Sequence, residues 1–383
     1  MNRKIRKIIN KINQKIITQK EIRAVTNVLK RGILSQADVG PMVRKFQSLF
    51  ATYLHRKYAF TTSSGTTALH ATVSALHLKR GDEIIIPALA NIADVSVLLQ
   101  EGIVPVFADV TKDTFCIDPK DVIKKVNTRT KAIIAVHMYG QPAEINELLR
   151  ISRKYNLILI EDCAQAIGAE YRNRLVGSFG DIACFSFYQT KNITCGEGGM
   201  IVTDKPEYAE RIESILNSGL KRNRNNIDNY DYNTIGYNYR LTEIQASIGI
   251  EQLKRLNKIN EIRRINTKIY QEELKNIDFV FQKEKKETKN VYFYLTGLLP
   301  ITLSALRDRF IRELRKNGVP VKKLYPVPLH KIDLLRRKIK YSCPVAEDIT
   351  KRLFNFYVNP GLTQRDISNF CEVIKRTYES LLL

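Results

Sequence analysis

The feature that most constrains this chain is a series of short, almost entirely apolar segments between Thr61 and about Asp204. Strands buried on both faces of a parallel sheet have this near-continuous apolar character. The segments expected to form strands are DEIIIPA, VPVFADV, KAIIAVHMYG, LILIEDCA, IACFSF and GMIVTD. Amphipathic stretches such as 144–155 separate them. The alternation predicts an α/β fold with a mostly parallel central sheet flanked by helices.

The character of the sequence changes near Thr242. The spacing of Thr242 and Gln245 is that of a capping box and predicts the start of a long helix. Its apolar side carries Ile244, Ile248, Leu253 and Leu256. Beyond about Lys258 follow a charged helix and a Lys/Glu-rich stretch. We therefore expect a large domain over residues 1–250, with a basic extension at about 1–18, and a smaller C-terminal α+β domain over residues 251–383.

The net charge of +23 is spread along the chain, so we expect no nucleic-acid partner and favour an anionic small-molecule substrate. The opening MNRKIRKIINKINQK either lies on a membrane surface or forms a solvated extension, and the second is the expectation. No apolar stretch reaches the ~20 residues of a membrane helix, so no membrane insertion is expected. The cysteines and histidines lack metal-ligand spacing, which predicts a reducing, cytoplasmic location and no metal site.

A first candidate site segment is Ser63–Leu69, which follows a short predicted strand and opens a helix over 66–78. Its small residues let backbone approach a ligand, and free amides at a helix N-terminus attract phosphate. Thr66 and Thr67 add hydroxyl donors. A Ser/Thr helix cap explains the same residues equally well.

A second segment is LILIEDCAQ, in which Asp162 directly follows a buried strand. A carboxylate at such a position is unfavourable unless a cationic group meets it. A protonated pyridine nitrogen suits Asp162, because the carboxylate keeps that nitrogen charged and the ring able to accept electrons. A structural aspartate that caps the next loop is the alternative.

A third segment, IACFSFYQTK, ends at Lys191 and precedes the Gly-rich CGEGGM. A lysine just past a buried strand loses its proton more readily than a solvated one and becomes a nucleophile. Ser186 stands where its hydroxyl reaches the same phosphate as Thr66. Alone, Lys191 is more simply a surface lysine. A phosphate loop, a strand-end Asp and a strand-end Lys, in this order, predict a pyridoxal 5′-phosphate (PLP) site on an α/β sheet.

Together these segments closely resemble the DegT/DnrJ/EryC1/StrS family of fold-type I sugar aminotransferases, in the aspartate aminotransferase superfamily. The resemblance runs from about Gln19 to the C-terminus. It also includes the segments ILSQADVGP, VHMYGQP, GYNYRLTEIQASIG, YPVPLH and CPVAE. It implies a large PLP-binding domain and a smaller C-terminal domain.

The resemblance implies a role for each matching residue. Lys191 would hold PLP as a Schiff base and shuttle the proton, while Asp162 pairs with the pyridinium. Gln165 would bond near the phenolic oxygen, and Ala164 would lie against the ring. The implied phosphate ligands are Gly65, Thr66 and Ser186, together with Asn238 reaching the partner subunit's phosphate, which implies a homodimer with shared sites. The implied substrate contacts are Tyr325, His330 and Arg240. For Arg240 the contact would be with the pyrophosphate, and a place at the subunit interface or a structural salt bridge are the alternatives.

Three segments depart from the family's usual pattern. Where the family has Thr and a ring-stacking aromatic residue, this chain has Ala90 and Asn91, so Asn91 is a candidate substrate contact. Asn217-Ser218-Gly219 replaces Asn-His-Gly. Ile167 resembles the branch that aminates C4 of 4-keto-6-deoxy nucleotide sugars.

The expected function is transfer of an amino group, from glutamate, to a nucleotide-linked keto sugar for lipopolysaccharide, capsule or glycan synthesis. One alternative is a PLP- or PMP-dependent sugar dehydratase, whose relatives carry His in place of Lys191. The other is a non-catalytic regulatory or scaffolding homologue.

Overall fold

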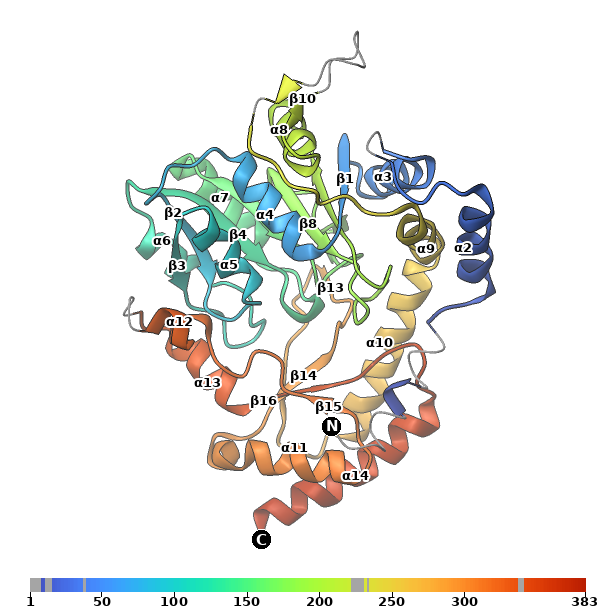
Figure 1. Ribbon diagram of the computed structural model, residues 1–383. Helices are drawn as coiled ribbons and strands as arrows, with labels where there is room; N and C mark the ends of the chain where they lie inside the picture. Colours follow the sequence, from blue (N-terminus) through green and yellow to red (C-terminus); the bar gives the residue numbers. More distant parts are fainter. Residues whose placement is uncertain (1–7, 11–15, 37–38, 222–230, 233, 337–340) are drawn as a thin grey trace.

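The computed structural model describes residues 8–10, 16–36, 39–221, 231–232, 234–336 and 341–383. Its main feature is a seven-stranded sheet in the order β1-β9-β8-β5-β4-β2-β3 (Figure 1). The strands are β1 Tyr58–Thr62, β2 Glu83–Pro87, β3 Val104–Ala108, β4 Thr130–Val136, β5 Ile158–Asp162, β8 Ile182–Ser186 and β9 Gly199–Thr203. All pairs from β3 to β8 are parallel, and β9 is antiparallel to both neighbours. The predicted mostly parallel sheet is confirmed.

Alternate residues of β8 enter two different cores, as the two-residue period of a strand requires. Ile182 and Cys184 pack with residues of α4 (Gly65–Ala75) and α5 (Ala93–Gln100). Ala183 and Phe185 pack on the opposite side with α3 (Pro41–Leu54) and α9 (Glu243–Leu253). Helices on both faces explain why these strands are almost entirely apolar.

The remaining elements of the large-sheet region are short strands and further helices. The helices are α2 Gln19–Arg31, α6 Pro119–Lys125, α7 Ile145–Tyr155 and α8 Pro206–Leu216. The short strands are β6 Glu170–Tyr171, β7 Arg174–Leu175, β10 Leu220–Lys221, β11 Asp231–Tyr232 and β13 Thr288–Lys289. Strand β13 pairs with β6, so a C-terminal segment reaches back to the region of the large sheet.

A smaller antiparallel sheet lies below the large one in Figure 1, in the order β12-β14-β16-β15. Its strands are β12 Val280–Phe281, β14 Leu295–Leu298, β15 Val321–Lys322 and β16 Leu353–Phe356. Its helices are α10 Leu256–Glu273, α11 Arg307–Lys316, α12 Asp333–Arg336, α13 Pro344–Arg352 and α14 Gln364–Leu382. The predicted boundary near residue 250 falls close to the junction of α9 and α10, and the division into domains stays a prediction.

The single long helix predicted to run from Thr242 past Leu256 is wrong, because α9 ends at Leu253 and α10 begins at Leu256. Thr242 does form the predicted capping box with Gln245. The Arg255 guanidinium bonds the carbonyl of Ile16 at 2.8 Å and also Glu21. The break lets α9 pack on α2 and α3 while α10 packs on α14.

Most of the predicted basic extension at residues 1–18 lies outside the described residues. Ile8 and Ile9, which are described, pack against the core of the smaller sheet. Among the described residues, every helix is too short or too polar to cross a bilayer.

Candidate active site

The predicted site residues converge on one cavity of about 270 Å³ at the ends of β5 and β8 and the start of α4. Eight of the predicted residues line it, namely Gly65, Thr66, Asn91, Asp162, Gln165, Ser186, Lys191 and Tyr325. Ala164 also contributes to the wall. In α/β sheets a ligand binds at such strand ends. Residues that the sequence separates by more than 250 positions therefore share one small volume.

The start of α4 forms one wall of the cavity. Ser64 and Thr67 make a capping box: the Ser64 hydroxyl accepts from the Thr67 amide at 3.1 Å, and Thr67 Oγ1 accepts from the Ser64 amide at 2.9 Å. The amides of Gly65 and Thr66 belong to the same first turn, where no intrahelical acceptor exists. The capping box of Ser64 and Thr67 is confirmed, while Gly65 and Thr66 line the cavity and their binding of phosphate stays a prediction.

Gly65 is required where α4 meets β8. A Cβ at this position would lie 2.7 Å from Cβ of Ser186, which is too close for any side chain. The glycine lets the helix N-terminus and the Ser186 hydroxyl lie close together on the cavity wall. Amides and hydroxyls so placed suit a phosphate group.

Lys191 lies in the loop between β8 and β9, with its amide bonded to the Tyr188 carbonyl at 2.9 Å. Its Nζ lies 4.6 Å from the centre of the Phe293 ring, which comes from the C-terminal part of the chain. Burial lowers the pKa of Lys191 to about 8, although Asp162 and Asp94 partly oppose the change. A larger share of the amine is therefore unprotonated near neutral pH than for a solvated lysine.

Asp162 is the last residue of β5 and is 3% exposed. One carboxyl oxygen accepts from the Ala164 amide at 2.8 Å. Burial raises the pKa of Asp162, while the Ala164 hydrogen bond and the nearby Lys191 and His137 act in the opposite direction. The carboxyl thus has capacity to accept a further hydrogen bond from a cationic ring nitrogen in the cavity.

Asn91, Gln165 and Tyr325 form a polar group on the cavity wall. Gln165 Oε1 accepts from the Tyr139 amide at 3.1 Å, which leaves Nε2 to donate to the Tyr325 hydroxyl at 3.2 Å. Asn91 hydrogen-bonds Tyr325 and also accepts from the Ala93 amide at 2.9 Å. The Tyr139 ring stacks on the Tyr325 ring with centres 6.0 Å apart. Asn91 therefore faces the cavity, held by a polar network.

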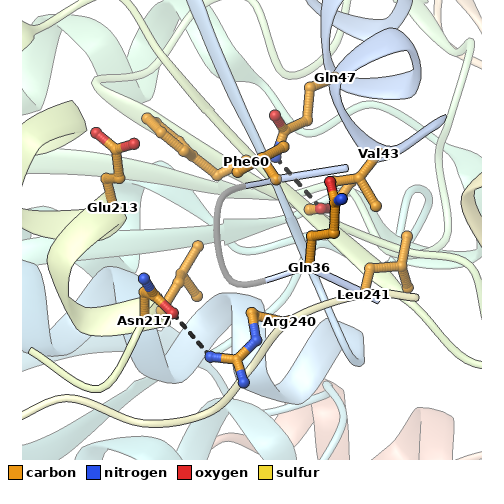
Figure 2. Close-up of a pocket in the computed structure, with 11 residues that line it drawn as sticks. Gln36, Val43, Gln47, Phe60, Glu213, Asn217, Arg240 and Leu241 are labelled. Atoms are coloured by element: carbon orange, nitrogen blue, oxygen red, sulfur yellow. Dashed lines mark hydrogen bonds between the residues drawn. The ribbon is translucent and has the colours of Figure 1, made fainter. Parts of the chain in front are cut away.

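Three predicted residues do not line this cavity. His330 is buried, and its Nε2 lies 3.0 Å from Glu347 Oε1. Arg240 donates to Asn217 at 2.7 Å beside a separate, mainly apolar pocket of about 80 Å³ (Figure 2). Asn238 is exposed and forms a backbone bridge with Asn217. Their predicted substrate and partner-subunit roles stay predictions.

Asp94 is the residue that sequence reasoning missed. It lies in the first turn of α5, is 0% exposed, and acts electrostatically on both Asp162 and Lys191. The signal was present in the sequence, since Asp94 is the one charged residue in the mainly apolar segment ADVSVLLQ.

The residues fit PLP. The α4 N-terminus with Ser186 suits its phosphate, Asp162 its ring nitrogen, and the Lys191 amine its aldehyde carbon. Among these observations, the buried Asp162 carboxyl argues most strongly for PLP, because it lacks a full set of donors and a cationic ring nitrogen would supply one.

Residues 15–375 match the DegT/DnrJ/EryC1/StrS aminotransferase family, which is nearly the whole chain. The chain belongs to this family. The predicted membership, the fold type I architecture and the PLP cofactor are thereby confirmed, and the protein is a PLP-dependent nucleotide-sugar aminotransferase.

Two curated relatives and one solved structure illustrate the similarity. The chain is 34% identical to the GDP-perosamine synthase of Escherichia coli O157:H7, over 96% of this chain and 98% of that protein. It is 35% identical to the UDP-N-acetyl-3-dehydro-α-D-glucosamine 3-aminotransferase of Acidithiobacillus ferrooxidans, over 82% and 83%. The structure of the Helicobacter pylori aminotransferase PseC superposes with a TM-score of 0.91 at 26% identity, over 95% and 97%.

Proposed function

We propose that this aminotransferase moves an amino group from glutamate to a nucleotide-linked 4-keto-6-deoxy sugar. The observation that carries the proposal is the single cavity that holds an amine of lowered pKa, a buried carboxylate and a helix N-terminus. The name of the Escherichia coli relative, GDP-perosamine synthase, supports a nucleotide-linked sugar as the acceptor. Amino sugars of this kind would supply lipopolysaccharide, capsule or other glycans in the cytoplasm.

We assign the chemical steps to residues of the cavity. PLP, when bound, supplies an electron sink for the bond that breaks at the amine-bearing carbon. Lys191 is the covalent anchor and, once released, takes and returns the proton at that carbon. Asp162 accepts the hydrogen bond from the ring nitrogen and balances its charge. Gly65, Thr66 and Ser186 bind the phosphate, and Gln165 orients the ring through its phenolic oxygen.

The polar wall of the cavity is assigned to the sugar. Asn91 and Tyr325 offer an amide and a hydroxyl at the cavity rim, where hydroxyl groups of a keto sugar would need partners. In this arrangement Asn91 substitutes hydrogen bonding for ring stacking.

We further propose a homodimer whose two sites each take residues from both chains. Asn238 is exposed and does not line the cavity of its own chain. Arg240 lies two residues further along the same segment, beside the separate pocket in Figure 2. A second chain placed over this face would receive Asn238 near its phosphate site.

Two measurements test these proposals. Purified protein with glutamate, assayed against a panel of nucleotide keto sugars, should aminate a 4-keto-6-deoxy sugar in preference to a 3-keto sugar; the reverse preference would overturn the substrate assignment. Inactive Lys191→Ala chains mixed with weak Asn238→Ala chains should regain part of the activity upon reassembly. A fully active monomer would rule out the shared site.

A further inference from the structure

Asp94 is a buried carboxyl whose two oxygens both lack a hydrogen-bond donor among the described residues. It is 0% exposed and belongs to α5, whose other buried residues are apolar. A deprotonated carboxylate in this position would be cut off from water, and only the backbone amides of Asn91 and Asp94 and the Lys191 amine would act to stabilise its charge. The side chain therefore requires either a proton or a cation.

The carboxyl of Asp94 adjoins that of Asp162 on the neighbouring β5. The two differ in their partners, since Asp162 accepts from the Ala164 amide at 2.8 Å, whereas no described donor lies within hydrogen-bond distance of the Asp94 oxygens and the amides of Asn91 and Asp94 act on them only electrostatically. The other titratable groups that face the pair are Lys191, His137, Cys163, Cys184 and Tyr325. Lys191 is the one amine in this set, and it faces both carboxyls.

We propose that Asp94 carries a proton at neutral pH and donates it in a hydrogen bond to Asp162, as a positioning residue that keeps the Asp162 carboxylate ionised and oriented. Two adjacent buried carboxyls do not both ionise readily, because like charges repel in a medium of low dielectric constant. The proton stays on Asp94, since Asp162 has the better donors for a negative charge. A proton also gives Asp94 the hydrogen-bonding partner that its deprotonated form lacks.

The electrostatics agree with this assignment. Burial, followed by the charge of Asp162, raises the pKa of Asp94 well above its usual value. The pair then carries one negative charge opposite Lys191. An oriented, ionised Asp162 is what a protonated ring nitrogen needs, so the inference rests on the site proposed above.

Infrared spectroscopy of the full-length protein after cofactor removal tests the protonation directly. At pH 7, the wild type should show a C=O stretching band of a protonated carboxyl group that is absent from Asp94→Asn. Asp113→Asn is a matched control, because Asp113 is ion-paired with Lys285 at 2.7 Å and should leave that band unchanged. A band that persists in Asp94→Asn, or no band in the wild type, would overturn the proposal. The measurement involves no turnover, so either result leaves the aminotransferase assignment untouched.

Cofactor binding tests the positioning role separately. Asp94→Asn keeps a neutral donor next to Asp162 and should bind PLP with nearly wild-type affinity in an absorbance titration. Asp94→Ala removes the donor and should weaken PLP binding by about 10- to 100-fold, the usual effect of a hydrogen bond to a charged group. Equal affinity of Asp94→Ala and the wild type would refute the role. If Asp94→Ala does not fold, the infrared comparison with Asp94→Asn still decides the protonation.

Discussion

Glu161 and Asp162 are consecutive residues of β5, and their side chains enter opposite environments. Glu161 accepts hydrogen bonds from the amides of Gly177 at 2.8 Å, Phe179 at 2.8 Å and Gly180 at 2.7 Å. Its oxygens also contact His137 Nε2 at 3.1 Å and Arg56 Nη2 at 4.0 Å. Asp162 has one amide donor and an acidic neighbour.

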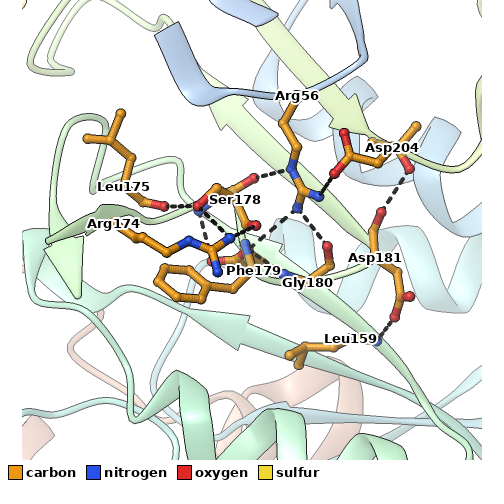
Figure 3. Close-up of polar contacts among 12 residues, drawn as sticks. Arg56, Leu159, Arg174, Leu175, Ser178, Phe179, Gly180, Asp181 and Asp204 are labelled. Atoms are coloured by element: carbon orange, nitrogen blue, oxygen red, sulfur yellow. Dashed lines mark hydrogen bonds and ion pairs between the residues drawn. The ribbon is translucent and has the colours of Figure 1, made fainter. Parts of the chain in front are cut away.

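The polar groups around Glu161 are themselves hydrogen-bonded or ion-paired. Arg56 donates to the carbonyls of Gly177 and Gly180 and pairs with Asp204 at 2.7 Å, as Figure 3 shows for Gly180 and Asp204. His137, Glu161 and Cys163 bring possible ligand atoms within 4.8 Å of one another, and the Glu161 oxygens in this group already accept hydrogen bonds from His137 and from the amides of Gly177, Phe179 and Gly180. These hydrogen bonds hold the loop that wraps Glu161.

The contrast teaches how to separate a structural buried charge from a reactive one. A carboxylate with every lone pair occupied stabilises the loop that wraps it. A carboxylate with an unfilled position, next to a second acid and a lysine of lowered pKa, is arranged for a ligand.

Removal of the Lys191 side chain should have the largest effect, and the effect should be on turnover. Lys191→Ala eliminates both the covalent anchor and the proton carrier, so turnover should fall by more than the ~10²–10⁴-fold typical of general acid–base catalysis alone. PLP should still bind through Asp162 and the α4 N-terminus. Steady-state assays with an absorbance titration measure both, and wild-type turnover in this variant would remove Lys191 from the mechanism.

Substitution of each carboxylate in turn breaks the comparison directly. Glu161→Gln places an amide group against existing donors and should lower the free energy of unfolding by about 3–5 kcal/mol, as for other broken buried pairs. Asp162→Asn should instead retain stability and weaken PLP binding by about 10- to 100-fold, since it loses a hydrogen bond to a charged group. Denaturant unfolding measures the stability of both variants, and titration with PLP measures their cofactor affinity. The same defect in both would show that the two sites are equivalent.

The pH dependence of stability should have opposite signs at the two sites. Burial raises the pKa of Glu161, but its hydrogen bonds to His137, Gly180 and Gly177 lower the pKa by a larger amount. The net effect is a pKa below the usual 4.5. Its contribution is therefore present above pH 4.5 and lost as the pH falls through the folded-state pKa. The pKa of Asp94 is raised in the folded state, so Asp94 contributes fully to the free energy of unfolding below pH 3.8. This contribution is lost as the pH rises through the folded-state pKa.

Thermal unfolding of apo-protein between mildly acidic and alkaline pH checks these signs. Relative to the wild type, Glu161→Gln should lose less stability upon acidification, and Asp94→Asn should lose less upon alkalinisation. If the melting temperature changed with pH by the same amount in the wild type and both variants, both assignments would be contradicted.

The smallest effect is expected at the rim, where Asn91→Phe restores an aromatic side chain. Ring stacking contributes about 0.5–1.5 kcal/mol, so PLP affinity should rise by up to roughly tenfold, while loss of the Asn91 amide should raise KM for the sugar. A KM that stays unchanged would contradict the assignment of Asn91 to the sugar. Unchanged values of both would separate Asn91 from ligand binding altogether.

Much of the site was predictable because its residues follow buried strands or open a helix. Asp162 and Lys191 stand at strand ends, which parallel topology brings to one edge of the sheet. Gly65 and Ser186 likewise stood out by position. Asp94 was missed because a single acid in a helix resembles a favourable first-turn charge. Arg240 and His330 were chosen by resemblance alone; their side chains bond Asn217 and Glu347, and their roles toward substrate stay predictions.

The sequence by itself determined the alternation of strand and helix, the family, and the lysine and aspartate at the strand ends, because these depend on local pattern and on the order of motifs. Tertiary structure decided which buried carboxylate is bonded on all sides and which is not. That distinction depends on loops such as 177–180 folding back over Glu161 and on α5 bringing Asp94 beside Asp162. Hydrogen bonds between segments distant in the chain leave no periodic trace, so only the packed structure reveals them.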